Sequence, residues 1–379
     1  MSLSEAVVSV ERALASPMNT WPGYTPAEFP YILYDEEGFT LLNHPNPPTT
    51  WPDDLQPGVM PINAVLTAVV PLPRQQNDLL PHLYRTGFKL YQQMHFAQLA
   101  QLDMYRALAY YPGFDAAYRA LCVTEAEVLT QAKYPPEQKA TYLAALTKQR
   151  YGLLHHHEDV LNLIRHLERT EDTARYVEQK ARNLLRSSNR YTLTPDVKWT
   201  RQTGTALCWL LDALEPGWQA QVETGKTPAD VLVTRYGDEP VDLSPLTLRN
   251  TEIQQERAIE REQGRALKKI RLIEGDALHI QLPREVTVRR DMQLERVIAL
   301  GDGRLLHEQF LTLTFEGGFI ECRGCPVVED YTGDDVLVSF HALPFRVENG
   351  TMKASTLTVK FSIPDAIQIA DNVFRLGSA

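Results

Sequence analysis

The sequence predicts an α+β protein in which a mostly helical domain is followed by an antiparallel β domain. From about residue 78 to residue 263, apolar residues recur every three or four positions, which is the period of an amphipathic helix. After residue 266, short segments alternate apolar with polar residues and are separated by Gly, Asp and Asn. A chain of 379 residues also exceeds the usual size of a single hydrophobic core, so we expect two domains.

Composition divides the chain into three parts. Residues 1–60 are rich in proline and aromatic residues, as in NHPNPP and WPDDLQPG, and should form extended loops packed on the main domain. Residues 61–265 should form the helical domain, and residues 266–379 the antiparallel β domain.

The elements follow in order. INAVLTAVVPL, at 62–72, should be a strand, followed by a helix that starts between 78 and 82. Further helical patterns lead to NTEIQQERAIEREQGRALKK, which is highly charged and should be an exposed helix that joins the two domains. The expected strands of the β domain are IRLIEG, LHIQLP, VTVRR, QFLTLTFEGGFIEC, VLVSFHAL and STLTVKFSI.

The overall charge excludes some functions. A net charge of -10 and a pI near 5.5 argue against a general affinity for nucleic acid or anionic membranes. Proteins that bind these partners usually carry an excess of basic residues. The first residues do not form a secretory signal, and no apolar run is long enough for a membrane span. Four cysteines in so long a chain do not form a disulfide framework, so we expect a cytoplasmic location.

The segment HLYRTGFKLYQ, at 82–92, lacks the groups that zinc chemistry needs. A zinc-peptidase helix carries His-Glu-x-x-His, in which two imidazoles four residues apart bind the metal and the glutamate acts as general base. Arg85, Thr86 and Lys89 occupy those positions. Arginine only donates hydrogen bonds, lysine is cationic at neutral pH, and a threonine hydroxyl is too weak a base. We therefore assign no catalytic residue to this helix.

A carboxylate interrupts the apolar face of a later helix. If residues 158–185 form one helix, its apolar stripe contains Leu161, Ile164, Leu167, Ala174, Ala181 and Leu185, with Glu171 on the same stripe. An ionised carboxylate that faces a core costs several kcal/mol unless it is paired. Glu171 should therefore be protonated, meet a cation or metal, or face an open cleft. The alternative is that it bends out to solvent from the edge of the stripe.

A strand, a helix that carries RTGFK and a later helix that carries EDTARY together resemble the gluzincin metallopeptidases. That family has His-Glu-x-x-His on the first helix and a third zinc ligand on the second, often as Glu-Gly-x-Ala-x-Tyr. Glu171, Ala174 and Tyr176 match this motif, while Asp172 replaces its glycine. LGDGRLLHEQFLTL is also similar to bacterial peptidases of this type.

The resemblance implies a zincin-like helical domain with a degenerate metal site. Its former zinc-site positions would be Arg85, Thr86, Lys89 and Glu171, with Tyr176 beside them. Arg85 and Lys89 lie about 40° apart around a helix, so both can point at one spot. We hypothesise that they form salt bridges with Glu171 where zinc would sit, with their charged groups within about 6 Å of it. The alternative is an ordinary solvated helix face.

Three functions remain open. The first is a catalytically inactive peptidase homologue, without metal or cofactor, that binds a peptide or protein in the former active-site cleft, along the 62–72 strand. The second is an active metal-dependent hydrolase with other ligands, drawn from His82, His95, His155–His157 and Glu171. The third is a structural or assembly protein that acts through exposed apolar patches of its β domain. The degenerate motif favours the first.

Two further groups of residues could carry chemistry. HHHED, at 155–159, is dense in metal-binding side chains, but adjacent histidines on a helix point about 100° apart, so an exposed helix start is expected. CRGC places Cys322 and Cys325 at the spacing of a redox pair. It follows a strand and precedes no helix, so we expect a turn with two free thiols, with a local disulfide as the alternative.

Overall fold

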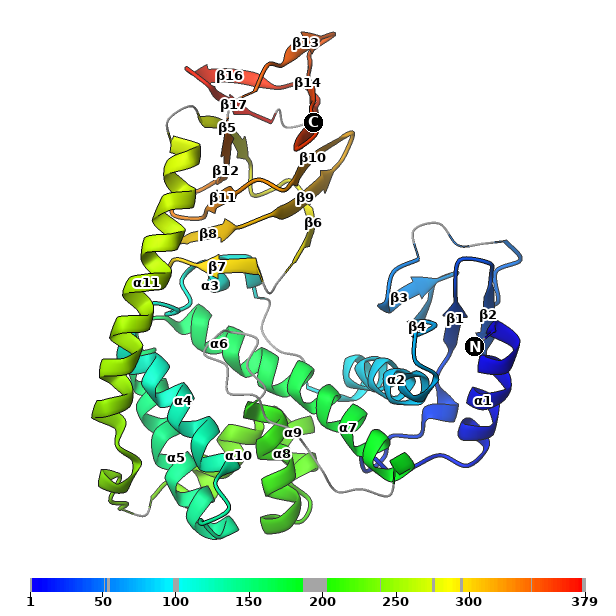
Figure 1. Cartoon of the computed structure of the whole chain (residues 1–379). Coiled ribbons are helices and arrows are strands. Elements are labelled where there is room, and N and C mark those ends of the chain that lie inside the picture. The colour runs from blue at the N-terminus through cyan, green and yellow to red at the C-terminus, as the bar shows by residue number, and fades with distance from the viewer. Residues whose placement is uncertain are drawn as a thin grey trace.

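The computed structural model describes residues 2–50, 52, 55–97, 102–186, 203–238, 240–274, 277–293, 296–341 and 343–376. It combines helices and sheets, with a largely helical N-terminal region and C-terminal antiparallel strands, as the sequence predicts. Figure 1 shows a small sheet at the right, helices at the lower left and lower centre, and the β domain above the helices.

The first 60 residues contain regular structure, so the expectation of extended loops there is wrong in part. They form helix α1 (Leu3–Ala15) and strands β1 (Tyr31–Tyr34), β2 (Phe39–Leu42) and most of β3 (Gly58–Ile62). Ser2 and Glu5 form a reciprocal capping box that begins α1. The strands are short, and although β1 and β2 form one hairpin and β3 and β4 (Val65–Pro71) another, the sheet is completed by the parallel pairing of β1 with the distant β4. Local patterns do not reveal that pairing.

The predicted strand at 62–72 is confirmed as β4 (Val65–Pro71). Its place in the sheet corrects the expectation that a peptide could bind along this strand. The strand order is β2-β1-β4-β3, and β4 pairs with β1 in parallel and with β3 antiparallel. Both of its edges are therefore used, and a peptide cannot add to it. The free edges of this sheet, among the described residues, belong to β2 and β3.

The predicted helix near 78–82 is α2 (Leu79–His95), which packs against β3 and β4. Its buried residues join α1 and one face of the sheet in a single hydrophobic core. The remaining helices of this region are α3 (Met104–Ala109), α4 (Ala116–Thr130), α5 (Pro136–Leu153), α6 (Glu158–Leu167), α7 (Thr173–Arg186), α8 (Thr203–Leu214), α9 (Trp218–Glu223) and α10 (Pro228–Tyr236).

The predicted long helix at 158–185 is present, with one irregularity. Helices α6 and α7 continue into each other through a π-helical segment (Glu168–Asp172). Because a π turn contains an additional residue, the buried face shifts around the helix. Glu168, Arg169 and Asp172 are buried there, whereas Glu171 lies at the border of the buried face. The side chain of Leu185, the last residue of the predicted stripe, lies outside the described part.

Helix α11 (Leu248–Glu274) is the predicted charged connecting helix. It buries one narrow face, with Ile259, Ala266 and Ile270, and exposes the rest. In Figure 1 it runs along the helical region and up beside the β domain. IRLIEG, expected as a strand, begins inside this helix, and that expectation is wrong. Tertiary packing of Ile270 and Ile273 on the β domain decides the conformation there.

The β domain contains two sheets that enclose a core of apolar side chains. One sheet has the order β13-β14-β15-β10-β9-β6, and the other the order β16-β17-β5-β12-β11-β8-β7. Their strands are β5 (Ala277–Leu282), β6 (Arg289–Met292), β7 (Val297–Ala299), β8 (Arg304–His307), β9 (Phe310–Phe315), β10 (Gly318–Arg323), β11 (Val327–Asp330), β12 (Val336–His341), β13 (Arg346–Glu348), β14 (Thr351–Ser355), β15 (Val359–Ile363), β16 (Ile367–Ala370) and β17 (Val373–Arg375). All pairs are antiparallel except β5 with β17.

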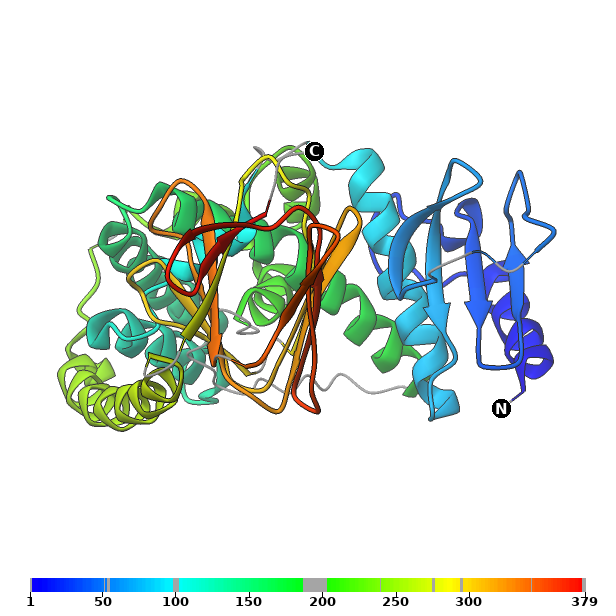
Figure 2. The ribbon, with the colours of Figure 1, turned by 90° about the horizontal axis from the view of Figure 1, so that it is seen from above.

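The β domain stands on the helical region and apart from the small sheet. Figures 1 and 2 both show it on the side of α3, α6 and α11, away from β1–β4. No helix among the described residues is long and apolar enough to cross a membrane.

Candidate functional site

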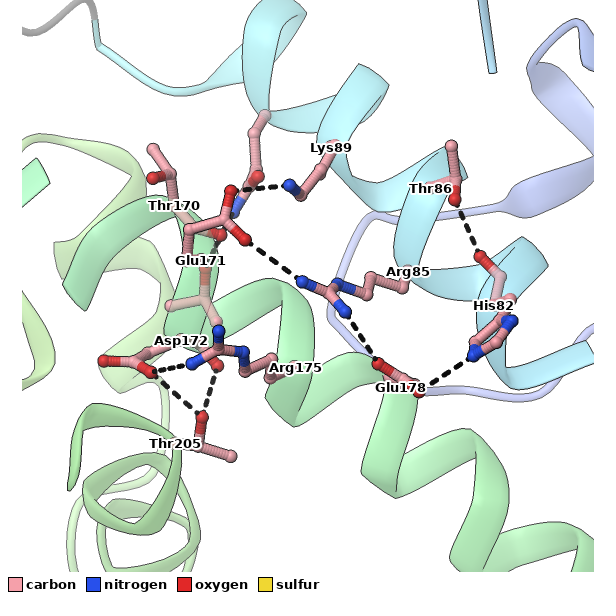
Figure 3. A network of polar contacts seen from close by, with 12 residues as sticks. His82, Arg85, Thr86, Lys89, Thr170, Glu171, Asp172, Arg175, Glu178 and Thr205 are labelled. Atoms are coloured by element: carbon pink, nitrogen blue, oxygen red, sulfur yellow. Dashed lines mark hydrogen bonds and ion pairs between the residues drawn. The ribbon is translucent and has the colours of Figure 1, made fainter. Parts of the chain in front are cut away.

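The cationic residues of α2 meet Glu171, as the salt-bridge hypothesis predicts. Arg85 Nη2 lies 3.1 Å from Glu171 Oε2, and Lys89 Nζ lies 2.5 Å from Glu171 Oε1. Both distances are well inside the predicted limit. Figure 3 shows the two cationic side chains pointing from α2 toward the single carboxylate.

Close packing of α2 on the sheet directs these side chains outward. A Cβ atom at Gly87 would lie 2.1 Å from the Tyr31 hydroxyl oxygen, so only glycine allows this approach. Leu83, Tyr84 and Phe88 are fully buried beside it. Positions 85, 86 and 89 therefore lie on the opposite, partly exposed side of α2.

The π-helical segment that carries Glu171 is anchored by the same helix. Gln92 Nε2 donates hydrogen bonds to the carbonyl oxygens of Arg169, at 3.3 Å, and Thr170, at 3.0 Å. It also lies 2.7 Å from Thr173 Oγ1. These hydrogen bonds add to those that Thr173 makes to the same two carbonyls, so the Gln92 side chain ties the π-helical segment to α2. One helix thus supplies both the cations and the support of their carboxylate.

The electrostatic balance keeps Glu171 ionised. Partial burial acts to raise its pKa, but the charges and hydrogen bonds of Lys89 and Arg85 outweigh it, and the pKa is lowered. The three side chains keep 29–31% of their exposure, so solvent screens the ion pairs. Partly exposed pairs contribute about 1 kcal/mol or less each, and they orient the helices more than they stabilise the fold.

The ion pairs extend in a row along α2 and α7. Glu178 lies 3.3 Å from Arg85 and 3.1 Å from Arg182, whose other nitrogen lies 2.6 Å from Asp78. His82 Nε2 lies 3.7 Å from Glu178. The sequence interpretation missed this extension, although positions 82, 85 and 89 on one helix and 171, 178 and 182 on the other show complementary helical spacings.

Two of the residues assigned to the former site lie outside the ion pairs. Thr86 Oγ1 donates to the carbonyl of His82 on its own helix, at 2.9 Å (Figure 3). Tyr176 is fully buried, and its hydroxyl donates to Asp212. Burial and the Asp212 carboxylate raise the Tyr176 pKa. The structure therefore brings together positions 85, 89 and 171 and leaves Tyr176 in the aromatic core.

The side chains at this site do not fit zinc. Arg85 and Lys89 offer only N–H donors, and both face the one carboxylate that could bind a metal. The described residues contain no group of three or more His, Cys, Asp or Glu side chains that could hold an ion, so the alternative ligand set is not assembled there. His155–His157 are exposed and precede α6, which confirms the expected helix start.

A buried charge triad behind Glu171 was not anticipated. Arg150 of α5 lies 2.9 Å from Glu125 of α4 and 3.2 Å from Glu168 of the π-helical segment. Their side chains are only 1%, 4% and 5% exposed. This triad fixes the segment that carries Glu171 to the helices behind it.

A second buried network joins the β domain to the helices. Glu329 of β11 is fully buried and lies 2.8 Å from His307 Nε2 and 3.0 Å from Arg290 Nε. The Tyr331 hydroxyl donates a hydrogen bond to Glu329 Oε1, at 3.1 Å. The Arg290 guanidinium also lies 4.6 Å from the ring centre of Tyr105 on α3. One carboxylate thus connects β6, β8 and β11, and through Arg290 it reaches the helical region.

The Cys322–Cys325 pair forms the predicted turn with two free thiols. Cys322 is buried in β10, and Cys325 follows in the turn. The structure has no disulfide there, so the local-disulfide alternative is not the form described.

Comparisons of this chain with protein-family models, with curated proteins and with solved structures find no match.

Proposed function

We propose that this protein is a non-catalytic relative of the gluzincin peptidases that binds a peptide beside the former metal site. The observation that carries the proposal is the convergence of positions 85, 89 and 171, where the family motif has its zinc ligands, on one point. Arg85 and Lys89 supply the positive charge that a metal would supply to Glu171. The site offers neither a set of metal ligands nor a general base that could activate a water molecule.

The edge strand β3 supports peptide binding. It lies at the end of the sheet beside α2, and its outer edge pairs with no other strand in the described part of the chain. An extended peptide can add to such an edge through main-chain hydrogen bonds. The β domain leaves Arg85, Lys89 and Glu171 about 30% exposed, so this side of α2 stays accessible.

Restoring the motif tests the assignment of the former ligands. The triple variant Arg85→His, Thr86→Glu, Lys89→His should retain one zinc ion per chain after gel filtration, measured by elemental analysis. The reason is that positions 85 and 89, the restored ligands, already face Glu171. Adding Glu171→Gln to the triple variant should weaken zinc binding at least about tenfold. Zinc retention no greater than that of the unchanged chain would count against the assignment.

Hydrogen exchange tests the peptide site. Adding a peptic digest of casein should slow amide exchange in β3 (Gly58–Ile62), because a bound strand protects outward N–H groups. The opposite free edge, β2 (Phe39–Leu42), serves as an internal control and should be unchanged. Equal slowing at both edges would indicate non-specific association, and no slowing at β3 would refute peptide addition.

A second candidate, assembly through the β domain, is favoured by apolar residues at its far end. The strands β13 and β16 are edges of their sheets, and Val347, Ile367 and Ile369 on them are at least half exposed. Exposed apolar side chains on free edges are typical of association surfaces. Sedimentation velocity at increasing protein concentration distinguishes this function, since only assembly through this surface requires self-association.

A further inference from the structure

A pocket lies at the junction of the helical region and the β domain, away from the ion pairs of α2. Its volume is about 320 Å³. The α3–α4 connection, α4 and the end of α5 form one side, and the turn between β7 and β8 forms the other. Its main lining residues are Tyr110, Phe114, Asp115, Tyr118, His157 and Leu300. Pockets between domains are common places for small ligands.

Close backbone contacts across the junction hold this pocket in shape. The Gly303 N–H donates to the carbonyl of Ala109. A Cβ atom at Gly303 would lie 2.8 Å from the Tyr110 hydroxyl oxygen, and one at Gly113 would lie 3.3 Å from the carbonyl oxygen of Ala299. A buried apolar core that both parts share lies behind these contacts. The pocket is therefore formed before any ligand binds.

Aromatic rings and a carboxylate determine what this pocket can bind. Tyr110, Phe114 and Tyr118 contribute rings whose faces attract cations. Asp115 Oδ1 accepts a hydrogen bond from the Tyr118 N–H, at 2.7 Å, which fixes the carboxylate at the start of α4. No Lys or Arg is found among the described lining residues, so an anion has no partner there.

The surroundings and the size of the pocket limit which ligands it can bind. The Arg119 guanidinium lies 5.7 Å from the Phe114 ring centre, but it is bound to the Gly113 carbonyl and to Glu262 and does not line the pocket. Asp115 and His157 are the only metal-binding side chains among the lining residues described, too few for a metal site. A volume of about 320 Å³ admits a molecule of roughly ten non-hydrogen atoms, at about 30 Å³ for each water-sized group.

We propose that this pocket binds a small organic cation, a protonated amine or a quaternary ammonium compound. In this proposal the aromatic rings of Tyr110, Phe114 and Tyr118 contact the cation, and the Asp115 carboxylate balances its charge. This site is independent of the peptide site proposed beside α2.

Calorimetric titration with matched probes tests the proposal. Choline and benzyltrimethylammonium are the cations, and 3,3-dimethylbutan-1-ol, which has the shape of choline without its charge, is the control ligand. Choline and benzyltrimethylammonium should each saturate a single site with a millimolar or lower dissociation constant. The alcohol should bind at least about tenfold more weakly than choline, because it forms no cation–π contact.

Two aspartate variants separate the pocket from general charge effects. Asp115→Asn should weaken cation binding about tenfold without lowering the melting temperature, because asparagine caps a helix as well as aspartate does. Asp302→Asn removes the same charge in the β7–β8 turn, where the side chain is 48% exposed and does not line the pocket, and should leave binding unchanged.

Three results would overturn the proposal. The first is equal binding of choline and the alcohol. The second is that neither cation binds at about 10 mM, a concentration well above the expected dissociation constant. The third is an equal loss of affinity in the two aspartate variants.

Discussion

Replacing Arg150 with methionine should lower the free energy of unfolding by about 4 kcal/mol, the largest effect that we expect from a single change. Arg150 is 1% exposed and is the only cation of the triad with Glu125 and Glu168. Without the guanidinium, two buried carboxylates remain near each other, and neither reaches water. Urea unfolding followed by far-UV circular dichroism measures the loss.

A surface arginine provides the control for this change. Arg249 also pairs with a glutamate, Glu252 at 3.0 Å, but its side chain is 74% exposed. Arg249→Met should change stability by no more than about 0.5 kcal/mol. Neutralising the buried carboxylates, as Glu125→Gln and Glu168→Gln, should restore part of the stability that Arg150→Met removes. A loss below about 1 kcal/mol in Arg150→Met would show that the triad is hydrated and not buried.

Replacing Glu329 with glutamine should cost about 3 kcal/mol at neutral pH. Burial alone would raise the Glu329 pKa, but the hydrogen bond and charge of His307, together with Arg290, lower it from 4.5 to about 2. Because the pKa is lower in the folded state than in the unfolded state, the carboxylate stabilises the fold above pH 4.5. This stabilisation is lost as the pH falls from 4.5 toward about 2.

The pH dependence of the Glu329 variant is the decisive measurement. The stability difference between the unchanged protein and Glu329→Gln should decrease from about 3 kcal/mol at pH 7 to about 1 kcal/mol at pH 3. Glu348→Gln, at a position where the side chain is 46% exposed, should show no such slope. A difference that stays constant between pH 7 and pH 3 would contradict the role of Glu329 as an ionised partner.

Local periodicity is sufficient to predict the elements that position the site. The helix that carries Arg85 and Lys89 and the strand before it follow from apolar spacing alone, and the four-residue separation of the two cations places them on one face. The apolar stripe predicts only that Glu171 is protonated, paired or open to a cleft, and the choice of Arg85 and Lys89 as its partners rests on the resemblance to the gluzincin motif. The salt bridges confirm the hypothesis that these two cations pair with Glu171. The evolutionary origin of the site stays a proposal.

The remainder depends on interactions between distant residues. The strands β1 and β2 are four residues long, and their hairpin joins the rest of the sheet through the parallel pairing of β1 with the distant β4. The π turn at Glu168–Asp172 has no local signature, since Gln92 and Arg150 stabilise it from other helices. The buried triad combines residues from three elements. Such contacts follow from the tertiary fold and cannot be identified from spacing along the chain.

The parallel pairing of β17 with β5 has a consequence for synthesis on the ribosome. The strand β5 begins the β domain, yet one of its two neighbours in the sheet is β17, the last strand that the structure describes. During translation, β5 and β12 can pair while the other edge of β5 stays open. Open strand edges promote association between chains. The nascent β domain therefore passes through an aggregation-prone stage that ends only when β17 emerges.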